Sequence, residues 1–115
     1  MSEKSVFKKI VDGEISTEFL LETADCLAFN DVSPQAPVHI LVIPKKEVVN
    51  VASLEDADER LAGKLLLAVR DVAKKLGLDE GGYRIVANCG QHGGQSVDHL
   101  HFHILGGRQM NWPPG

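Results

Sequence analysis

The segment His99-Leu100-His101-Phe102-His103-Ile104-Leu105 alternates imidazole and apolar side chains with a period of two. Successive side chains of a β-strand point to opposite faces, so the histidines share one face and the apolar residues share the other. A helix would instead spread the imidazoles around its axis. The segment therefore predicts a strand whose apolar side packs on a core and whose other side carries three histidines.

Such a histidine face is compatible with metal binding, with nucleophilic or acid–base catalysis, or with a purely structural role. Imidazole titrates near neutral pH and is a good neutral nucleophile, which favours catalysis. Residues two apart on a strand are about 6.6–6.8 Å apart, so His99 and His103 lie about 13 Å apart and hardly share one tetrahedral ion. A mononuclear zinc site would need His39 or a carboxylate from another strand. We expect no metal.

A glycine-rich turn, Gly90-Gln91-His92-Gly93-Gly94-Gln95-Ser96, runs directly into the first of these histidines. Glycines let main-chain N–H groups approach and surround an anion, and the Ser96 hydroxyl adds a donor. The turn lacks the lysine and the following helix of a Walker loop. Its position before three co-facial histidines predicts a phosphate-binding loop beside a nucleophile.

The remaining pattern predicts an α+β fold, with about five strands in an antiparallel sheet, one long helix and a short N-terminal helix. The short helix includes Phe7 and ends at Asp12-Gly13. Besides 99–105, strands are expected at 19–22, 26–29, 38–43 and 83–88.

The long helix is the clearest of these elements. Ser53 and Asp56 have the spacing of a capping box, and Gly77 suits the position after the last turn. The helix should cover one face of the sheet with a stripe of apolar residues. This stripe comprises Leu61, Leu65, Val69, Val72 and Leu76.

Composition limits the remaining possibilities. The chain has 115 residues, the usual size of one domain, so we expect residues 1–115 to form a single domain. A net charge of −4 argues against binding to nucleic acid, and no stretch reaches the ~20 apolar residues of a membrane span. Neither a signal peptide nor a cysteine framework is evident, so a cytoplasmic location is expected, with Cys26 and Cys89 as buried, reduced thiols.

Taken together, these motifs resemble the histidine triad (HIT) family, and in particular its histidine-triad nucleotide-binding (HINT) branch. The signature is His-x-His-x-His followed by apolar residues, and the resemblance extends over nearly the whole chain. Other matching segments are 31–37, 39–46, 94–97 and the C-terminal run from Leu105 to Gly115. The resemblance implies a HIT-like fold.

The resemblance also implies an activity, that of a homodimeric hydrolase of purine nucleoside phosphoramidates (adenosine 5′-monophosphoramidase type). Such an enzyme cleaves the P–N bond and releases AMP or GMP and an amine. His101 would be the nucleophile and form a nucleotidyl-histidine, while His103 would hold phosphate oxygens. His99 would be mainly orienting, and His39 would support the protonation state of the nucleophile. Ser96 would bind phosphate or assist the leaving amine.

A nucleotide site is implied as well, without cofactor or metal. Asp31 would bind the ribose hydroxyls, and the main chain around Gly94, Gln95 and Val97 would bind phosphate, with Asn88 beside it. The purine slot would be apolar and would comprise Phe7, Ile10, Ile15, Phe29, Val32 and Leu41.

Three positions depart from the branch, namely Asp98, Glu47 and Asn111. Strand alternation places Asp98 away from the histidine face. In the family the C-terminal tail reaches the partner's site, so Asn111 bears on the specificity for the amine. The alternative to a hydrolase is a non-catalytic purine-nucleotide-binding or scaffolding protein. The sequence leaves open the physiological substrate, the choice between adenine and guanine, regulatory partners, and an additional nuclear location in a eukaryote.

Overall fold

The computed structural model describes residues 3–115, which form an α+β fold. Its helices are α1 (Val6–Val11), α2 (Glu59–Lys75) and α3 (Leu78–Gly81), with short 3-10 turns η1 (Val51–Ser53) and η2 (Asp56–Asp58) before α2. Its strands are β1 (Leu21–Glu22), β2 (Cys26–Asn30), β3 (Val38–Pro44), β4 (Tyr83–Val86) and β5 (Phe102–Gly106).

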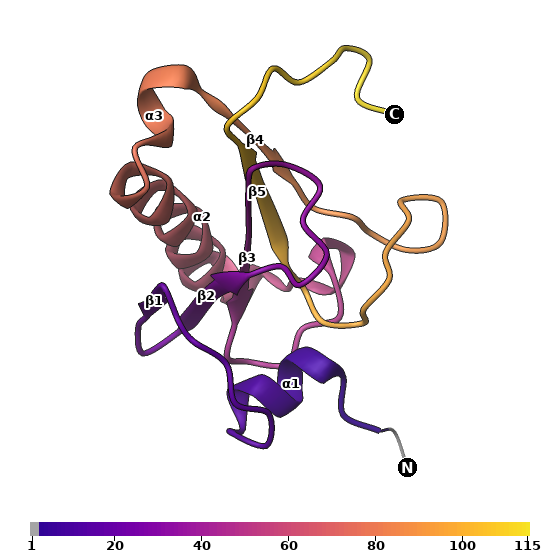
Figure 1. Cartoon of the computed structure of the whole chain (residues 1–115). Coiled ribbons are helices and arrows are strands. Elements are labelled where there is room, and N and C mark those ends of the chain that lie inside the picture. The colour runs from indigo at the N-terminus through magenta and orange to yellow at the C-terminus, as the bar shows by residue number, and fades with distance from the viewer. Residues whose placement is uncertain (1–2) are drawn as a thin grey trace.

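All five strands belong to one antiparallel sheet in the order β1-β2-β3-β5-β4. This confirms the expected sheet with one long helix and a short N-terminal helix, and the short helix α3 is an addition that was not predicted. Strand β5 lies between β3 and β4, although β3 and β5 are far apart in sequence (Figure 1). In the register, Leu41 is opposite His103 and His39 is opposite Leu105. The side chains of His39 and His103 are therefore diagonal neighbours on one face.

The sheet has a separate hydrophobic cluster on each face. Alternate strand residues such as Ala28, Val42 and Ile104 pack with the buried side of α2 in the larger cluster. Their neighbours in sequence, such as Phe29 and Leu41, pack with α1 in the smaller cluster. In Figure 1 helix α2 runs along the sheet while α1 lies below it. The histidines of interest lie on the α1 side.

The start of α2 differs from the expectation. The predicted capping box of Ser53 and Asp56 is wrong, because Asn50 accepts the Ser53 N–H and thereby caps η1. The carboxylate that caps the approach to α2 is Asp58, which accepts the Glu55 N–H at 3.0 Å. The end is as expected, since Gly77 follows the last turn with a φ of 72°.

The predicted apolar stripe of α2 is buried at its centre and open at its ends. Leu65, Val69 and Val72 are buried, whereas Leu61 is half-buried and Leu76 is 38% exposed. The three central residues therefore supply most of the apolar surface that this stripe buries against the sheet.

The histidine strand is shorter than predicted. It begins at Phe102, because the N–H of Leu100 donates to the Val48 carbonyl (2.6 Å) instead of joining the sheet. Strand β4 likewise ends at Val86 rather than at Asn88. The alternation still holds through this segment, since Leu100 belongs to the α2-side cluster.

Two further features of the chain complete the description. Cys26 is buried as expected, but Cys89 is exposed, so the prediction of two buried thiols is wrong for Cys89. Its segment follows the end of β4 and leads into the glycine-rich loop, where no neighbouring element covers it. Within residues 3–115, none of the helices has both the length and the apolar character that crossing a bilayer requires.

Candidate active site

A cavity of about 420 Å³ opens on the α1 side of the sheet. Every residue of the expected apolar slot lines it: Phe7, Ile10, Ile15, Phe29, Val32 and Leu41. Five of the expected polar or main-chain contacts also line it: Asp31, Ser96, Val97, His101 and His103. Residues from α1, β2, β3, β5 and the loop before β5 thus meet at one place.

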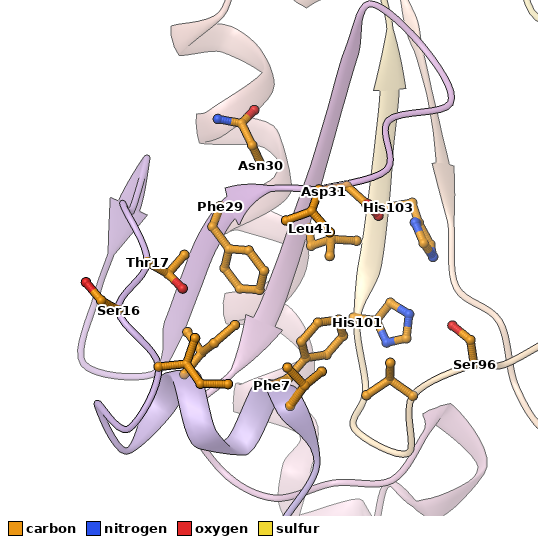
Figure 2. A pocket seen from close by; sticks show the side chains of 15 residues that line it. Phe7, Ser16, Thr17, Phe29, Asn30, Asp31, Leu41, Ser96, His101 and His103 are labelled. Carbon is orange, nitrogen blue, oxygen red and sulfur yellow. The ribbon is translucent and has the colours of Figure 1, made fainter.

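The cavity has an apolar and a polar side. Figure 2 shows Phe29, Leu41 and Phe7 toward one side, and His101, His103 and Ser96 toward the other. Phe7 and Phe29 pack edge to face with ring centroids 5.7 Å apart. Val32 is 98% exposed, so it forms the rim rather than the wall. This separation suits a ligand with a flat apolar part joined to a charged part.

His101 stands at the boundary between the two sides. It is buried, and the Phe7 ring packs edge to face against it with centroids 5.0 Å apart. Its Nδ1–H donates to the main-chain carbonyl of His99 at 2.7 Å. Because a carbonyl can only accept, the ring proton of the neutral imidazole is held on Nδ1. The lone pair of His101 is therefore on Nε2.

His99 is the most buried histidine and does not line the cavity. Its Nε2–H donates to the Pro44 carbonyl at 2.9 Å. Burial lowers the pKa of His99, against an opposing effect of this hydrogen bond, and favours the neutral ring. The main-chain carbonyl of His99 contacts the His101 ring, while the His99 side chain anchors the segment to the end of β3.

His39 and His103 form a hydrogen-bonded pair on adjacent strands. The N–H of Gln35 donates to His39 Nδ1 at 3.0 Å, so the His39 ring proton is on Nε2. This Nε2–H donates to His103 Nδ1 at 2.8 Å. His103 therefore carries its own proton on Nε2. The Asp31 carboxylate lies 3.4 Å from His39 Nε2 and adds a second, weaker acceptor there.

His103 is neutral at physiological pH. Burial, and then the neighbouring His101 and His39, lower its pKa from 6.5 to about 4, with Asp31 opposing. A neutral ring with its proton on Nε2 offers one hydrogen-bond donor and no charge. His103 can thus hold an anionic oxygen by donation alone.

Asp31, His39 and His103 also have the composition of a metal site, since one ligand atom from each lies within 4.8 Å of the others. The hydrogen bond from Gln35 disfavours this use. A metal on His39 Nε2 requires the ring proton on Nδ1, which is where the Gln35 N–H already points. The cluster is better suited to its observed hydrogen-bonded state.

The glycine-rich loop borders the polar side. A Cβ at Gly93 would lie 2.4 Å from the Cys89 carbonyl oxygen, so only glycine fits there. The Asn88 side chain donates to the Gly93 carbonyl at 2.6 Å. Asn88 thus fastens the loop and does not line the cavity.

Gln95 and Gly94 do not line the cavity either. The Gln95 amide donates to the Val49 and Val97 carbonyls, and its oxygen accepts the Gly90 N–H at 2.9 Å. With its side chain fully engaged, Gln95 can contribute to a ligand only through its main chain. Gly94 adopts a φ of 73°, which gives the loop its turn.

Several cavity residues were not predicted from the sequence: Val6, Ser16, Thr17 and Asn30. Asn30 ends β2 and directly precedes Asp31, an expected site residue, and this adjacency is the one feature of the sequence that indicates a place for Asn30 at the cavity. Ser16 and Thr17 lie in the irregular segment between α1 and β1, where no periodicity indicates which way a side chain points. The roles expected for the other residues remain predictions.

The positions that depart from the resemblance lie outside the cavity. Asp98 and Glu47 are exposed. Asn111 is exposed, and its main-chain carbonyl accepts a hydrogen bond from Arg84 at 2.7 Å.

The fold and the site together define a small α+β protein with a histidine-lined cavity on one face of its sheet. The family model described as HIT domain matches residues 12–110, and the chain belongs to this family.

Similar proteins agree with this assignment. A HIT-like protein of Synechococcus elongatus is 52% identical over the full length of both chains. The crystal structure of a HIT family hydrolase from Legionella pneumophila has a TM-score of 0.94 at 46% identity, covering 97% of this chain and 100% of that one. A histidine triad nucleotide-binding protein from Candida albicans has a TM-score of 0.81 at 34% identity, covering 96% and 83%.

Proposed function

We propose that the chain is a purine nucleoside phosphoramidate hydrolase of the HINT branch, with His101 as its nucleophile. The observation that carries this proposal is the hydrogen bond from His101 Nδ1–H to the His99 carbonyl. It leaves the lone pair on Nε2 of a buried ring that lines the cavity. A neutral imidazole held in one tautomer is ready to attack phosphorus without prior loss of a proton.

In the first step, His101 Nε2 attacks phosphorus as the P–N bond breaks and the amine leaves with a proton. The Ser96 hydroxyl lines the same polar side and is exposed, so it would donate to the leaving nitrogen while it takes a proton from solvent water. The new N–P bond makes the imidazole ring cationic. Its Nδ1–H then donates more strongly to the His99 carbonyl, which stabilises the charge as it develops.

In the second step, water attacks phosphorus and the P–N bond to His101 breaks. The products are a nucleoside monophosphate and the neutral imidazole that began the cycle. The imidazole leaves neutral and needs no added proton, and the proton of the attacking water is released through Ser96 to solvent, so the same group would serve both steps. Neutral His103 would hold a phosphate oxygen through Nε2–H without competing with His101 for a proton.

The apolar side would take the purine base, between Phe7, Phe29 and Leu41, and Asp31 would accept from the ribose hydroxyls. Ser33 N–H already donates to Asp31 Oδ1 at 2.8 Å, which holds the carboxylate in place. We also propose that the chain is a single domain and forms a homodimer in the cytoplasm. It would need no cofactor or metal and would have no nucleic-acid or membrane partner. The edge strand β4, with Ile85 43% exposed, supports a second copy as its neighbour.

The test is release of a fluorescent amine from an adenosine 5′-phosphoramidate, comparing wild type with His101→Ala, each with and without EDTA. We expect turnover in wild type alone, unchanged by EDTA, and a loss of at least about a thousandfold in the variant. His92→Ala is the matched control. His92 lies, like His101, in the segment between β4 and β5, but it is exposed and does not line the cavity.

A nucleotidyl-protein trapped in wild type and absent from His101→Ala would add direct support. Near-wild-type turnover in His101→Ala would overturn the assignment of the nucleophile. Binding of AMP without any turnover in wild type would instead favour the non-catalytic nucleotide-binding alternative, and loss of turnover in EDTA would favour a metal site.

A further inference from the structure

We infer that Arg108 is a positioning residue that sets the tautomers of His39 and His103 through the main chain of Gln35. Arg108 lies beyond the end of β5 and does not line the cavity. Arg108 would set these tautomers in the free protein, before any ligand binds. The consequence for catalysis rests on the function proposed above.

A continuous series of hydrogen bonds joins Arg108 to the histidine pair. Arg108 Nη2–H donates to the Gln35 carbonyl oxygen at 3.0 Å. The N–H of the same residue donates to His39 Nδ1 at 3.0 Å, and His39 Nε2–H donates to His103 Nδ1 at 2.8 Å. The Gln35 N–H at Nδ1, together with the Asp31 carboxylate 3.4 Å from Nε2, thus favours the ring proton on His39 Nε2.

A second contact holds the same loop against the C-terminal segment. A Cβ on Gly107 would lie 2.9 Å from Pro37 Cβ, and Gly107 has a φ of 88°. Glycine therefore allows the main chain after β5 to lie directly on the loop that carries Gln35. Arg108 and Gly107 fix this loop from its middle and from its end.

The contacts of Arg108 indicate that it acts on the main chain. Its guanidinium donates to two carbonyl oxygens, those of Gln35 and Gln109. Among residues 3–115 no carboxylate lies within ion-pair distance of it. Of its two hydrogen bonds within residues 3–115, the one to Gln35 reaches a distant part of the sequence.

Reversing the tautomers would change what His103 presents to a ligand. If the Gln35 N–H moved away, His39 Nδ1 could take the ring proton, and His39 Nε2 would become an acceptor. His103 Nδ1 would then have to donate to it, which leaves a lone pair on His103 Nε2. A lone pair repels a phosphate oxygen, whereas the present Nε2–H attracts it.

The experiment is a long-range ¹H–¹⁵N spectrum of the imidazole rings, which distinguishes Nδ1–H from Nε2–H without any substrate. Wild type should show His39 and His103 with Nε2–H, and Arg108→Ala a mixture of both tautomers. We expect Arg108→Lys to recover part of the wild-type pattern, since it keeps a cationic donor. AMP binding should weaken about tenfold in Arg108→Ala.

Arg84→Ala is the matched control, because Arg84 also donates to a main-chain carbonyl of the C-terminal segment, that of Asn111. In Arg84→Ala the tautomers of His39 and His103 should be the same as in wild type. Gly107→Ala tests the same loop independently and should give a mixture, with thermal melting to show that each variant is folded. Wild-type tautomers in folded Arg108→Ala or Gly107→Ala, or an equal change in Arg84→Ala, would overturn the inference.

The outcome is separable from that of the proposed function. If Arg108→Ala changes the tautomers and wild type releases no amine, the positioning role is supported and only the proposed hydrolysis is removed. Full hydrolysis with unchanged tautomers in Arg108→Ala would do the reverse.

Discussion

The Nδ1 of His101 hydrogen-bonds the main-chain carbonyl of His99 at 2.7 Å, so a backbone group holds the proposed nucleophile. A side chain in that position could be removed by substitution, whereas this carbonyl is present whatever residue occupies position 99. The side chain of His99 is directed to the Pro44 carbonyl instead. The two histidine side chains therefore have different hydrogen-bond partners, and we expect their roles to be separable.

The first prediction concerns His99→Ala. The variant loses a fully buried ring and leaves the Pro44 carbonyl without its partner, so the free energy of unfolding should fall by about 2–4 kcal/mol. Turnover should stay within about tenfold of wild type, because the His99 carbonyl remains. Denaturant unfolding and amine release measured on the same samples check both parts. A loss of turnover as large as that of His101→Ala would contradict the separation.

The second prediction concerns the ribose. Asp31→Asn keeps the side-chain oxygen that accepts the Ser33 N–H but loses the second acceptor oxygen. We expect KM for an adenosine phosphoramidate to rise about tenfold. The matched control is the 2′,3′-dideoxy substrate, on which wild type and variant should have equal kcat/KM. A similar loss on both substrates would mean that Asp31 acts on His39 rather than on the ribose.

The third prediction concerns stability in acid. The pKa of His103 is lowered from 6.5 to about 4 in the folded protein, chiefly by burial, and the pKa of His99 is lowered too. Above pH 6.5 neither the folded nor the unfolded chain takes up these protons. Between about pH 6.5 and 4 the unfolded chain binds a proton that folded His103 does not. The free energy of unfolding must therefore fall as the pH is lowered through this range.

The contribution of His103 to this fall is about 3 kcal/mol at most, and it stops growing below about pH 4. Urea unfolding at half-unit steps of pH measures it. His103→Gln should flatten the curve between pH 6.5 and 4, whereas His92→Gln, at an exposed position, should leave it unchanged. A His103→Gln curve parallel to that of wild type would refute the assignment.

The fourth prediction compares two glycines. Gly93→Ala places a Cβ against the Cys89 carbonyl oxygen and should destabilise the protein by about 1–3 kcal/mol, with weaker AMP binding. Gly63→Ala meets nothing within 4 Å on the exposed side of α2 and should stabilise it by about 0.5–1 kcal/mol. Thermal melting of both variants gives the signs, and a stabilising Gly93→Ala would show that the loop can rearrange.

Much of this architecture could be predicted from side-chain periodicity. Alternation in His99–Leu105 placed the histidines on one face, and the stripe through Leu65 and Val72 identified the side of α2 that is buried. Both signals arise because a regular element repeats its orientation at a fixed interval. The composition of the apolar slot came from the family resemblance, and all its residues do line the cavity.

What escaped prediction depends on contacts between distant segments. Strand β5 starts late because Leu100 bonds to Val48, and Asn88 serves Gly93 rather than the cavity. Nothing in the local sequence indicates that Gln35 would share its N–H with His39 or that Arg108 would hold Gln35. Hydrogen bonds of irregular segments have no period, so only the folded chain shows them.

The division of the sheet into two clusters has a consequence for engineering. The α2 side contains none of the proposed catalytic groups, whereas the α1 side contains Phe7, Phe29 and Leu41 together with the cavity. Because neighbouring residues of each strand face opposite ways, a library that randomises only the α1-side positions leaves the α2-side packing untouched. Selection for new base preferences can therefore explore many sequences on a constant scaffold.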